Sequence, residues 1–350
     1  VGNKNTTSRR TIIIDTSTPT IFFTTNTENN ATNKSTSSIL INVTASDTNP
    51  ANLTYILVNS TAEINRTFLT ITTSGNYSFN YTSLPDDRYF FNVTLTDIAG
   101  NKAFTETRTV LIDTTFPLIN YTHPTQANGT NVSVNYIAIN ISYTEINFAN
   151  LTFILVNITS GFTTELNRTF VSSPIGTLLN FTSLSDGTYL YNVTITDSAG
   201  NKNTTERRTI IIDATAPTID YEVPTWGNNT NLSMTSIIIN VTFTEANFAN
   251  FTFILVNSTA EINRTFVTSS TQTLLNFTSL TDDRYSYNVT LTDIAGNKVF
   301  TLTRFILLDT VAPNVSLVYP ENDTTFNSIN SFRMIFNVTD ANDVANATLR

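Results

Sequence analysis

Apolar and polar residues alternate along most of the chain with a period of two. Every second residue from Tyr89 to Leu95 is apolar, and polar residues such as Asn92 lie between them. The same alternation runs through residues 137–141 and 237–241. Because successive side chains of a strand point to opposite faces, this pattern predicts strands with one buried and one solvated face. No segment has the period of a helix, and the apolar runs have the length of strands.

The pattern is itself repeated. The segment Asn92–Lys102 returns as Asn192–Lys202 and again as Asn288–Lys298. A second marker, an Asp followed four residues later by Pro, recurs at spacings of 98, 100 and 96 residues. A repeat of this size indicates an array of similar domains. The markers divide the chain into the tail of a preceding repeat (1–15), three whole repeats (16–113, 114–213 and 214–309) and the start of a further repeat (310–350).

Each repeat contains about seven alternating segments, separated by turn residues at the spacing that is typical of a β-sandwich. In the turn Asp97–Asn101, the Asp side chain can accept from backbone N–H groups and Gly100 can adopt a positive φ. A Tyr begins the preceding strand in every repeat, at Tyr89, Tyr189 and Tyr285. This is the position of a tyrosine corner, whose hydroxyl bonds to backbone upstream.

The combination Leu-x-Asp-(Gly/Asp)-x-Tyr and Asp-x-Ala-Gly-Asn resembles the signature of bacterial and archaeal Ig-like repeats. The match covers all three whole repeats. The resemblance implies an all-β chain of tandem immunoglobulin-like sandwiches, as found in adhesins and other long surface proteins. The links between repeats are short and each carries one Pro, which leaves neighbours little freedom and favours an extended arrangement.

Composition restricts the function further. Charged residues make up only 13% of the chain and the net charge is −9, so there is no basic surface for a nucleic acid. The chain has no Cys, which excludes disulfides and thiolate chemistry. No apolar run approaches the roughly 20 residues of a membrane span. The resemblance to Ig-like surface proteins implies an extracellular or cell-surface location, and we expect any targeting segment to lie outside this sequence.

Asn-x-Ser/Thr sequons are unusually dense, at 32 in 350 residues. In a strand, the Asn and the Thr of a sequon such as Asn92-Val93-Thr94 share one face, which we expect to be solvated. Asn is a poor strand residue, so its frequent placement there favours N-linked glycans. The alternative is an accident of an Asn- and Thr-rich composition, copied by duplication. The candidate acceptors are Asn42, Asn52, Asn59, Asn65, Asn80, Asn92, Asn140, Asn150, Asn157, Asn167, Asn180, Asn192, Asn240, Asn250, Asn257, Asn263, Asn276, Asn288, Asn337 and Asn346.

A second candidate is a cation site at each junction. In an Ig-like sandwich, the link that enters a domain lies near two of its loops, and each of these three segments carries a carboxylate. The expected sets are Asp113, Glu145 and Asp197; Asp213, Glu245 and Asp293; and Asp15, Asp47 and Asp97. Three carboxylates suit a structural Ca²⁺. The alternative is that the third Asp of each set caps its own turn while the others are solvated. No other cofactor is expected.

Residues for catalysis are scarce. The sequence has a single His, His123, and only one repeat carries it. With no Cys and no placed base, no nucleophile–base pair can be assembled. The pair Asp86/Asp87 becomes Asp186/Gly187 in the second repeat, as a turn would. We therefore expect a chain that is not an enzyme.

The sequence favours a structural role as a glycosylated cell-surface stalk or extracellular filament, in which copies of the chain associate. Two alternatives remain open. The repeats could present the binding tip of an adhesin, or they could be spacers of a secreted hydrolase. A divergent tip domain or a catalytic domain elsewhere in the protein would distinguish these alternatives from a stalk.

Overall fold

The computed structural model describes residues 2–12, 14–159, 164–172, 177–327, 331–342 and 347–348. In these residues the chain is all-β, as the alternating pattern predicted. It divides into two compact units. One comprises residues 1–129, 137–181 and 188–209, and the other comprises residues 130–136, 182–187 and 210–350. The boundaries of the sequence repeats stay a prediction, and we use the repeats below to name equivalent positions.

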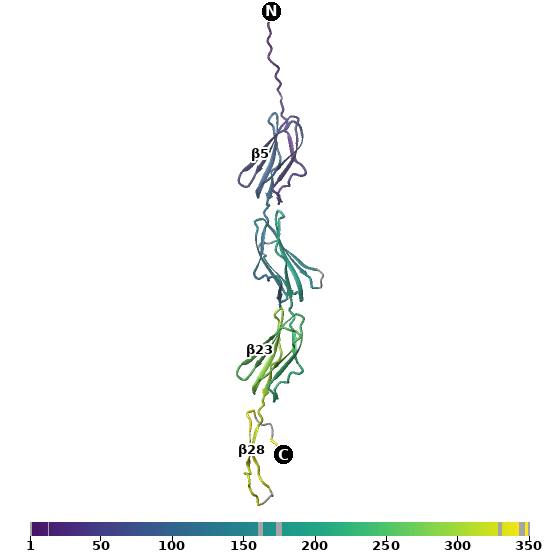
Figure 1. Cartoon of the computed structure of the whole chain (residues 1–350). Coiled ribbons are helices and arrows are strands. Elements are labelled where there is room, and N and C mark those ends of the chain that lie inside the picture. Colours follow the sequence, from purple (N-terminus) through teal and green to yellow (C-terminus); the bar gives the residue numbers. More distant parts are fainter. Residues whose placement is uncertain are drawn as a thin grey trace. The chain divides into compact units, whose positions relative to one another are not determined.

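The strands of the first repeat form two sheets (Figure 1). The smaller sheet has the order β1-β3-β6, and the larger has the order β2-β9-β7-β4-β5 with β8 paired to β7. All of these pairs are antiparallel except β2 and β9, which run parallel. The strands are β1 (Thr20–Phe23), β2 (Thr32–Lys34), β3 (Ile39–Ser46), β4 (Pro50–Val58), β5 (Glu63–Thr70), β6 (Gly75–Tyr81), β7 (Asp87–Asp97), β8 (Lys102–Phe104) and β9 (Arg108–Ile112).

The third repeat, in the second unit, has the same two sheets, with the orders β19-β21-β24 and β20-β27-β25-β22-β23, and β26 pairs with β25. Its strands are β19 (Thr218–Glu222), β20 (Thr230–Leu232), β21 (Ile237–Thr244), β22 (Phe248–Val256), β23 (Glu261–Val267), β24 (Leu274–Phe277), β25 (Asp283–Asp293), β26 (Lys298–Phe300) and β27 (Arg304–Leu308). A further pair, β28 (Asn314–Tyr319) and β29 (Ile335–Thr339), follows it.

The middle repeat contributes strands to both units. In the first unit β12 pairs with β10 and β15, β13 pairs with β14 and β16, and β16 pairs with β17. In the second unit the parallel pair of β11 and β18 begins at Thr130 and Ile210. The strands are β10 (Leu118–Thr122), β11 (Thr130–Val132), β12 (Ile137–Thr144), β13 (Phe148–Asn157), β14 (Thr164–Val171), β15 (Leu178–Phe181), β16 (Gly187–Asp197), β17 (Lys202–Thr204) and β18 (Arg208–Ile212).

The expected count of about seven strands was too low, because two segments of each repeat are interrupted. In the first repeat the chain leaves the small sheet after β1 and joins the large sheet as β2. Its last strand is divided at Thr105, whose side-chain oxygen accepts the N–H of Val93 at 3.0 Å. The side chain therefore replaces a backbone carbonyl at this point of the ladder.

The core confirms the period of two. Along β7, Tyr89, Phe91, Val93 and Leu95 are all at most 1% exposed, whereas Asn92 is half-buried. They pack against the inward residues of the small sheet, such as Ile41. Burial of these alternate apolar residues holds the two sheets together.

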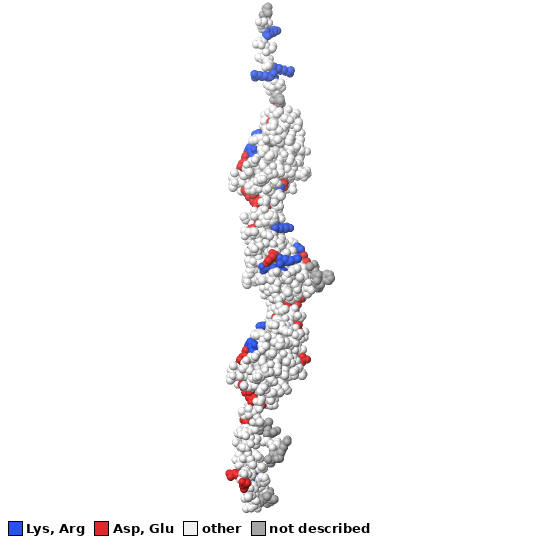
Figure 2. Space-filling view, viewed as in Figure 1, with Lys and Arg blue, Asp and Glu red and all other residues white. Residues whose placement is uncertain are grey.

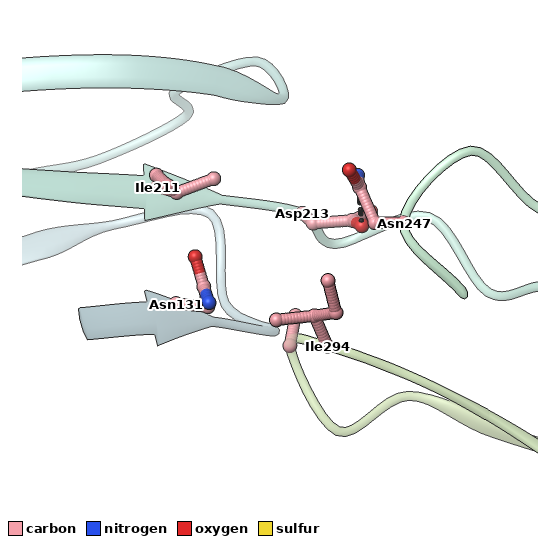
Figure 3. Close-up of a pocket in the computed structure, with 6 residues that line it drawn as sticks. Asn131, Ile211, Asp213, Asn247 and Ile294 are labelled. Carbon is pink, nitrogen blue, oxygen red and sulfur yellow. Dashed lines mark hydrogen bonds between the residues drawn. The ribbon is translucent and has the colours of Figure 1, made fainter. Parts of the chain in front are cut away.

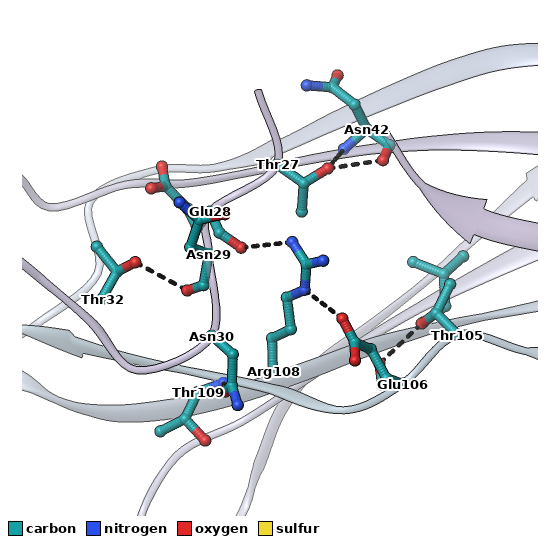
Figure 4. A network of polar contacts seen from close by, with 11 residues as sticks. Thr27, Glu28, Asn29, Asn30, Thr32, Asn42, Thr105, Glu106, Arg108 and Thr109 are labelled. Carbon is teal, nitrogen blue, oxygen red and sulfur yellow. Dashed lines mark hydrogen bonds and ion pairs between the residues drawn. The ribbon is translucent and has the colours of Figure 1, made fainter. Parts of the chain in front are cut away.

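A polar network closes one edge of the first sandwich (Figure 4). Arg108 on β9 donates to the carbonyl of Glu28 at 3.0 Å and to the carboxylate of Glu106 at 2.7 Å. Its guanidinium also lies 4.5 Å from the centre of the Phe23 ring. Arg108 therefore attaches the segment between β1 and β2 to β9 of the large sheet.

Both predicted turn devices are present in the first repeat. Gly100 has a φ of +96°, and Asp97 accepts the N–H of Asn101 at 2.8 Å. The hydroxyl of Tyr89 donates to the carbonyl of Pro85 at 2.9 Å, which is the bond of a tyrosine corner. Tyr285 makes the equivalent bond in the third repeat.

Candidate cation sites and glycosylation sites

The structure brings each of the three expected acidic sets together. In every set, one carboxylate oxygen from each residue lies within 4.8 Å of those of the other two residues. The sets are Asp15, Asp47 and Asp97; Asp113, Glu145 and Asp197; and Asp213, Glu245 and Asp293. A spacing of this size is compatible with oxygens that surround one cation at about 2.3–2.6 Å.

Three different elements supply the carboxylates of the second set. Asp113 directly follows β9, Glu145 directly follows β12, and Asp197 is the last residue of β16. Asp113 and Asp197 are 4% and 2% exposed, and Glu145 is half-buried. The site therefore depends on a link residue that is held against two loops of the next repeat.

Two asparagines hold this link residue in place. The side-chain N–H of Asn147 donates to Asp113 Oδ2 at 2.7 Å. That of Asn201 donates to the Asp113 carbonyl at 2.7 Å and to Asp197 Oδ2 at 2.7 Å. Each asparagine therefore joins a link residue to one loop of the repeat that follows.

The same arrangement recurs in the second unit, and Figure 3 shows the bond between Asp213 and Asn247. Asn247 donates to Asp213 Oδ2 at 2.7 Å, and Asn297 donates to the Asp213 carbonyl and to Asp293 Oδ2. A small cavity of about 140 Å³ adjoins Asp213 and is also lined by Asn131, Ile211, Asn247, Ile294 and Ala295.

Among the described residues, none of the nine carboxylates forms an ion pair with Lys, Arg or His. Like charges that are close together and partly buried repel each other strongly. Donation from the Ser17 N–H and from the Asn49 side chain keeps the pKa of Asp15 below its usual range, so this carboxyl stays ionised. Oxygen-only donors of this kind fit Ca²⁺ better than a softer metal.

The alternative interpretation, that the third Asp of each set caps its own turn while the others are solvated, is correct for the third Asp but not for Asp113 and Asp213. Asp97, Asp197 and Asp293 each cap their own turn, because each accepts the backbone N–H of the Asn four residues later. Two of the link residues, Asp113 and Asp213, are not solvated, however, since they are only 4% and 5% exposed. Packing of the link against the loops removes water from these two carboxylates.

Sequence reasoning missed the asparagines, although two signals could have found them. An acid-x-Asn triplet recurs at Asn49, Asn147 and Asn247, and the Asn of Asp-x-Ala-Gly-Asn recurs at Asn101, Asn201 and Asn297. None of these six is a sequon, so their repetition is not explained by glycosylation. Their role is to donate to the link carboxylate and its carbonyl.

The link is also held from the preceding repeat. Asp86 accepts the backbone N–H of Thr114 at 2.8 Å and the hydroxyl of Thr115 at 2.7 Å. Asp186 accepts from the Ala214 N–H and the Thr215 hydroxyl in the same way. Asp86 and Asp186, which the sequence indicated as turn residues rather than catalytic ones, therefore hold the link in place.

The candidate glycosylation sites differ in exposure. Asn65, Asn167 and Asn263 on the outer strands β5, β14 and β23 are exposed, as are Asn80, Asn180 and Asn276 on β6, β15 and β24, and Asn337 on β29. The other described candidates are half-buried, and Asn346 lies outside the described residues. In the third repeat Asn263 and Asn276 line one open groove of about 450 Å³.

One expectation about these sequons was wrong. Thr94 was expected to be solvated with Asn92, but it is 8% exposed, and the equivalent Thr290 is also 8% exposed. Each threonine lies on a central strand of the larger sheet, between neighbours on both sides. Cross-strand side chains therefore cover positions that the period of two places on the outer face.

Few charges interrupt this outer surface. In the view of Figure 2, small groups of Lys, Arg, Asp and Glu are separated by wide uncharged areas.

The single histidine, His123, is exposed, and its backbone carbonyl accepts a hydrogen bond from the side chain of Asn140. None of the described segments forms a helix with the length and hydrophobicity that a membrane crossing would need.

Comparisons with known proteins agree with this architecture. Residues 24–114 match one family described as bacterial Ig-like domain, and residues 179–214 match a second family with the same description. No curated protein matches the chain significantly. The tandem Ig-like sandwich fold is therefore supported by the sheets and by the two family matches.

Three solved structures have weak similarity to this chain. One, titled a tetra-tandem repeat in the extending region of a large adhesion protein, is 18% identical with a TM-score of 0.33, and the alignment covers 87% of this chain and 78% of that one. The chicken CNTN1 FN1-FN3 domains are 14% identical (TM-score 0.33, 81% and 96% covered). The Clostridium thermocellum CbhA fibronectin(III)-like modules are 11% identical (TM-score 0.30, 55% and 93% covered).

Proposed function

We propose that this chain is a non-catalytic, extracellular spacer of tandem Ig-like repeats that forms part of a cell-surface stalk or filament. The observation that carries this proposal is the double attachment of the link. Asp86 holds Thr114 and Thr115 from the repeat before, and Asn147 and Asn201 hold Asp113 from the repeat after. A link with so many hydrogen bonds suits a protein whose task is to set a distance.

The surface chemistry supports the same role. Only 13% of the residues are charged, and exposed sequons occur on outer strands of both sheets. N-linked glycans at these sites would keep such a surface soluble and would protect the edge strands from pairing with other chains. Association of copies into a filament would then use surfaces that carry no glycan.

Protease treatment of intact native cells tests location and modification together. We expect release of peptides from this chain in which Asn65 and Asn80 carry glycans, because both side chains are exposed. Asn49 is the matched control, since Pro50 follows it and no sequon is formed. Bare peptides at Asn65 and Asn80 would contradict the glycan coat, and release only after cell lysis would contradict the surface location.

An adhesin is the second candidate, and one comparison favours it. The large adhesion protein above contains a region of tandem repeats that its description calls extending. In that case the present repeats would hold a separate binding domain away from the cell. Cryo-electron microscopy of native material distinguishes the two, because an adhesin ends in a distinct binding domain whereas a stalk or filament shows only further similar repeats.

A further inference from the structure

The outer face of the larger sheet carries one row of residues that crosses four strands. Phe68 on β5 is opposite Thr54 on β4, and Thr54 is opposite Thr94 on β7. Thr94 is in turn opposite Phe104 on β8. The row therefore has two threonines in the centre and a phenylalanine at each end.

The two threonines of the row are buried, and the two phenylalanines are exposed. Thr54 and Thr94 are 7% and 8% exposed, while Phe68 and Phe104 are 69% and 65% exposed. A phenylalanine ring exposed to this degree at each end of a row of buried threonines needs an explanation. Both threonines are the third residue of a sequon, with the acceptors Asn52 and Asn92.

The third repeat has the same row. Phe266, Thr252, Thr290 and Phe300 are opposite one another in the same order. The two phenylalanines are 65% and 63% exposed, and the threonines are 7% and 8% exposed. The first and third repeats therefore present the same combination of rings and sequons.

The middle repeat differs at one position and so provides an internal comparison. Its row is Phe170, Thr152, Thr194 and Thr204, so a threonine replaces the ring beside Thr194. Thr194 is half-buried rather than buried, and its hydroxyl is 2.9 Å from that of Thr204.

The acceptor nitrogen of Asn92 lies on the side of the exposed ring. Asn92 is two residues before Thr94 on the same face, so Phe104 is its diagonal neighbour, at about 7–8 Å between Cα atoms. Its Nδ2 donates to the hydroxyl of Thr107, which lies between β8 and β9. Asn288 donates to Thr303 in the same way, beside Phe300.

We propose that the first sugar of an N-linked glycan on Asn92 packs its C–H face on the ring of Phe104, and that the glycan on Asn288 packs on Phe300. This inference rests on the proposed glycosylation. A pyranose combines apolar C–H groups with hydroxyls, and so it matches an exposed ring whose cross-strand neighbours include Thr94 and Asn92. The glycan of Asn192 meets Thr204 instead and has no ring to pack on.

The modification itself follows ordinary N-glycosyl transfer. The Asn Nδ2 forms a bond to C1 of the sugar of a lipid-diphosphate-linked oligosaccharide, and the bond from C1 to the phosphate oxygen breaks. Nδ2 loses one proton, and the lipid diphosphate leaves with the bonding electrons. Because Thr94 and Thr290 are buried in the folded sheet, the transferase must read these sequons before the repeats fold.

Nuclear magnetic resonance of the full glycosylated chain, with ¹³C-labelled sugars, tests the contact. An aromatic ring shifts protons above its face upfield, so we expect upfield ring protons for the first sugars at Asn92 and Asn288 but not at Asn192. Phe104→Leu keeps an apolar side chain and should abolish the shift at Asn92 alone. Thr204→Phe should create the shift at Asn192.

Glycopeptide mass spectrometry on the same samples gives the occupancy of each site. Occupied Asn92 without an upfield shift, or a shift that persists in Phe104→Leu, would overturn the contact and leave the glycosylation proposal intact. Bare Asn92 and Asn288, with bare Asn65 and Asn80, would overturn both. Bare Asn92 and Asn288 beside occupied Asn65 would overturn the contact alone.

Discussion

At the scale of single residues, Tyr55 has a buried hydroxyl group that the equivalent residues of the other repeats lack. It is 0% exposed, and its hydroxyl has no hydrogen-bond partner among the described residues. Burial raises its pKa to about 12. The equivalent residues Phe153 and Phe253 are equally buried but have no hydroxyl to satisfy.

We therefore expect Tyr55→Phe to raise the free energy of unfolding by about 1 kcal/mol, because it removes an unpaired buried hydroxyl. Chemical denaturation of the full chain measures the change. Phe253→Tyr is the reverse experiment and should lower stability by about 1–3 kcal/mol. Lower stability in Tyr55→Phe would mean that the hydroxyl has a partner in solution, such as a bound water.

The hydrogen bonds that hold Ala214 and Thr215 of the link depend on the protonation state of Asp186. The hydroxyl of Thr215 and the N–H of Ala214 donate to its carboxylate, and they keep its pKa below the usual value despite partial burial. A carboxyl whose pKa is lower in the folded state stabilises that state above its unfolded pKa, and it loses this contribution as the pH falls through the folded value. The attachment should therefore weaken only below about pH 4.

An NMR titration of the Asp186 side-chain carbon checks this prediction. Thr215→Val removes the hydroxyl donor and should move the pKa of Asp186 up toward 3.8. Thr218, on β19, does not donate to Asp186, so Thr218→Val is a control that should leave the titration unchanged. An unchanged pKa in Thr215→Val would show that the hydroxyl bond does not form in solution.

At the scale of elements, the divided last strand depends on one side chain. Thr105, Thr205 and Thr301 occupy equivalent positions, and each accepts a buried backbone N–H of the neighbouring strand at 2.9–3.0 Å. Thr105 also donates to the carbonyl of Glu106 at 3.0 Å. Thr105→Val should cost about 1–3 kcal/mol of stability, because it leaves the Val93 N–H buried without an acceptor.

Thr105→Ser is the matched control, since it keeps the hydroxyl and loses only a methyl group. Denaturation of both variants gives the comparison, and hydrogen exchange at the Val93 amide reports the bond directly. Equal stability of Thr105→Val and Thr105→Ser would show that another group accepts the Val93 N–H.

These interruptions explain why the number of strands could not be predicted while their period could. Tyr89 to Leu95 alternate because burial acts on each residue locally, and a sequence pattern records that. The break at Thr105 arises from a bond to Val93, 12 residues away, which no local pattern reveals. Thr94 was misjudged for the same reason, because its burial depends on residues in neighbouring strands.

The acidic sets were predictable to a similar degree. Knowledge of the sandwich topology was enough to place Asp113, Glu145 and Asp197 together. It could not show that Asn147 and Asn201 would hold the link, because those bonds depend on side-chain directions. The binding of Ca²⁺ stays a prediction.

At the scale of the whole molecule, calcium should act on stability through the junctions. A ligand that binds only the folded state at 100 times its dissociation constant adds about 2.7 kcal/mol per site. We expect Ca²⁺ to raise the melting temperature of the full chain and a chelator to reverse the effect. Calorimetry with Asp213→Asn should show a smaller rise, because one carboxylate of that set is neutralised.

Asp220→Asn is the control for this experiment. Asp220 is an exposed acid on β19 outside the three sets, so its replacement should leave the calcium response unchanged. A melting temperature that does not respond to Ca²⁺ in the unsubstituted chain would exclude stabilisation by calcium. The asparagine bonds would then be what holds the links.

The parallel pairing of β2 with β9 has a mechanical consequence. Tension along the chain pulls β2 toward its N-terminal end and β9 toward its C-terminal end, and these directions are opposite because the strands are parallel. The bonds between them, including those from Ala31 to Thr109 and from Asp113 to Lys34, are loaded together in shear rather than opened in turn. A repeat built in this way therefore resists extension until several hydrogen bonds break at once.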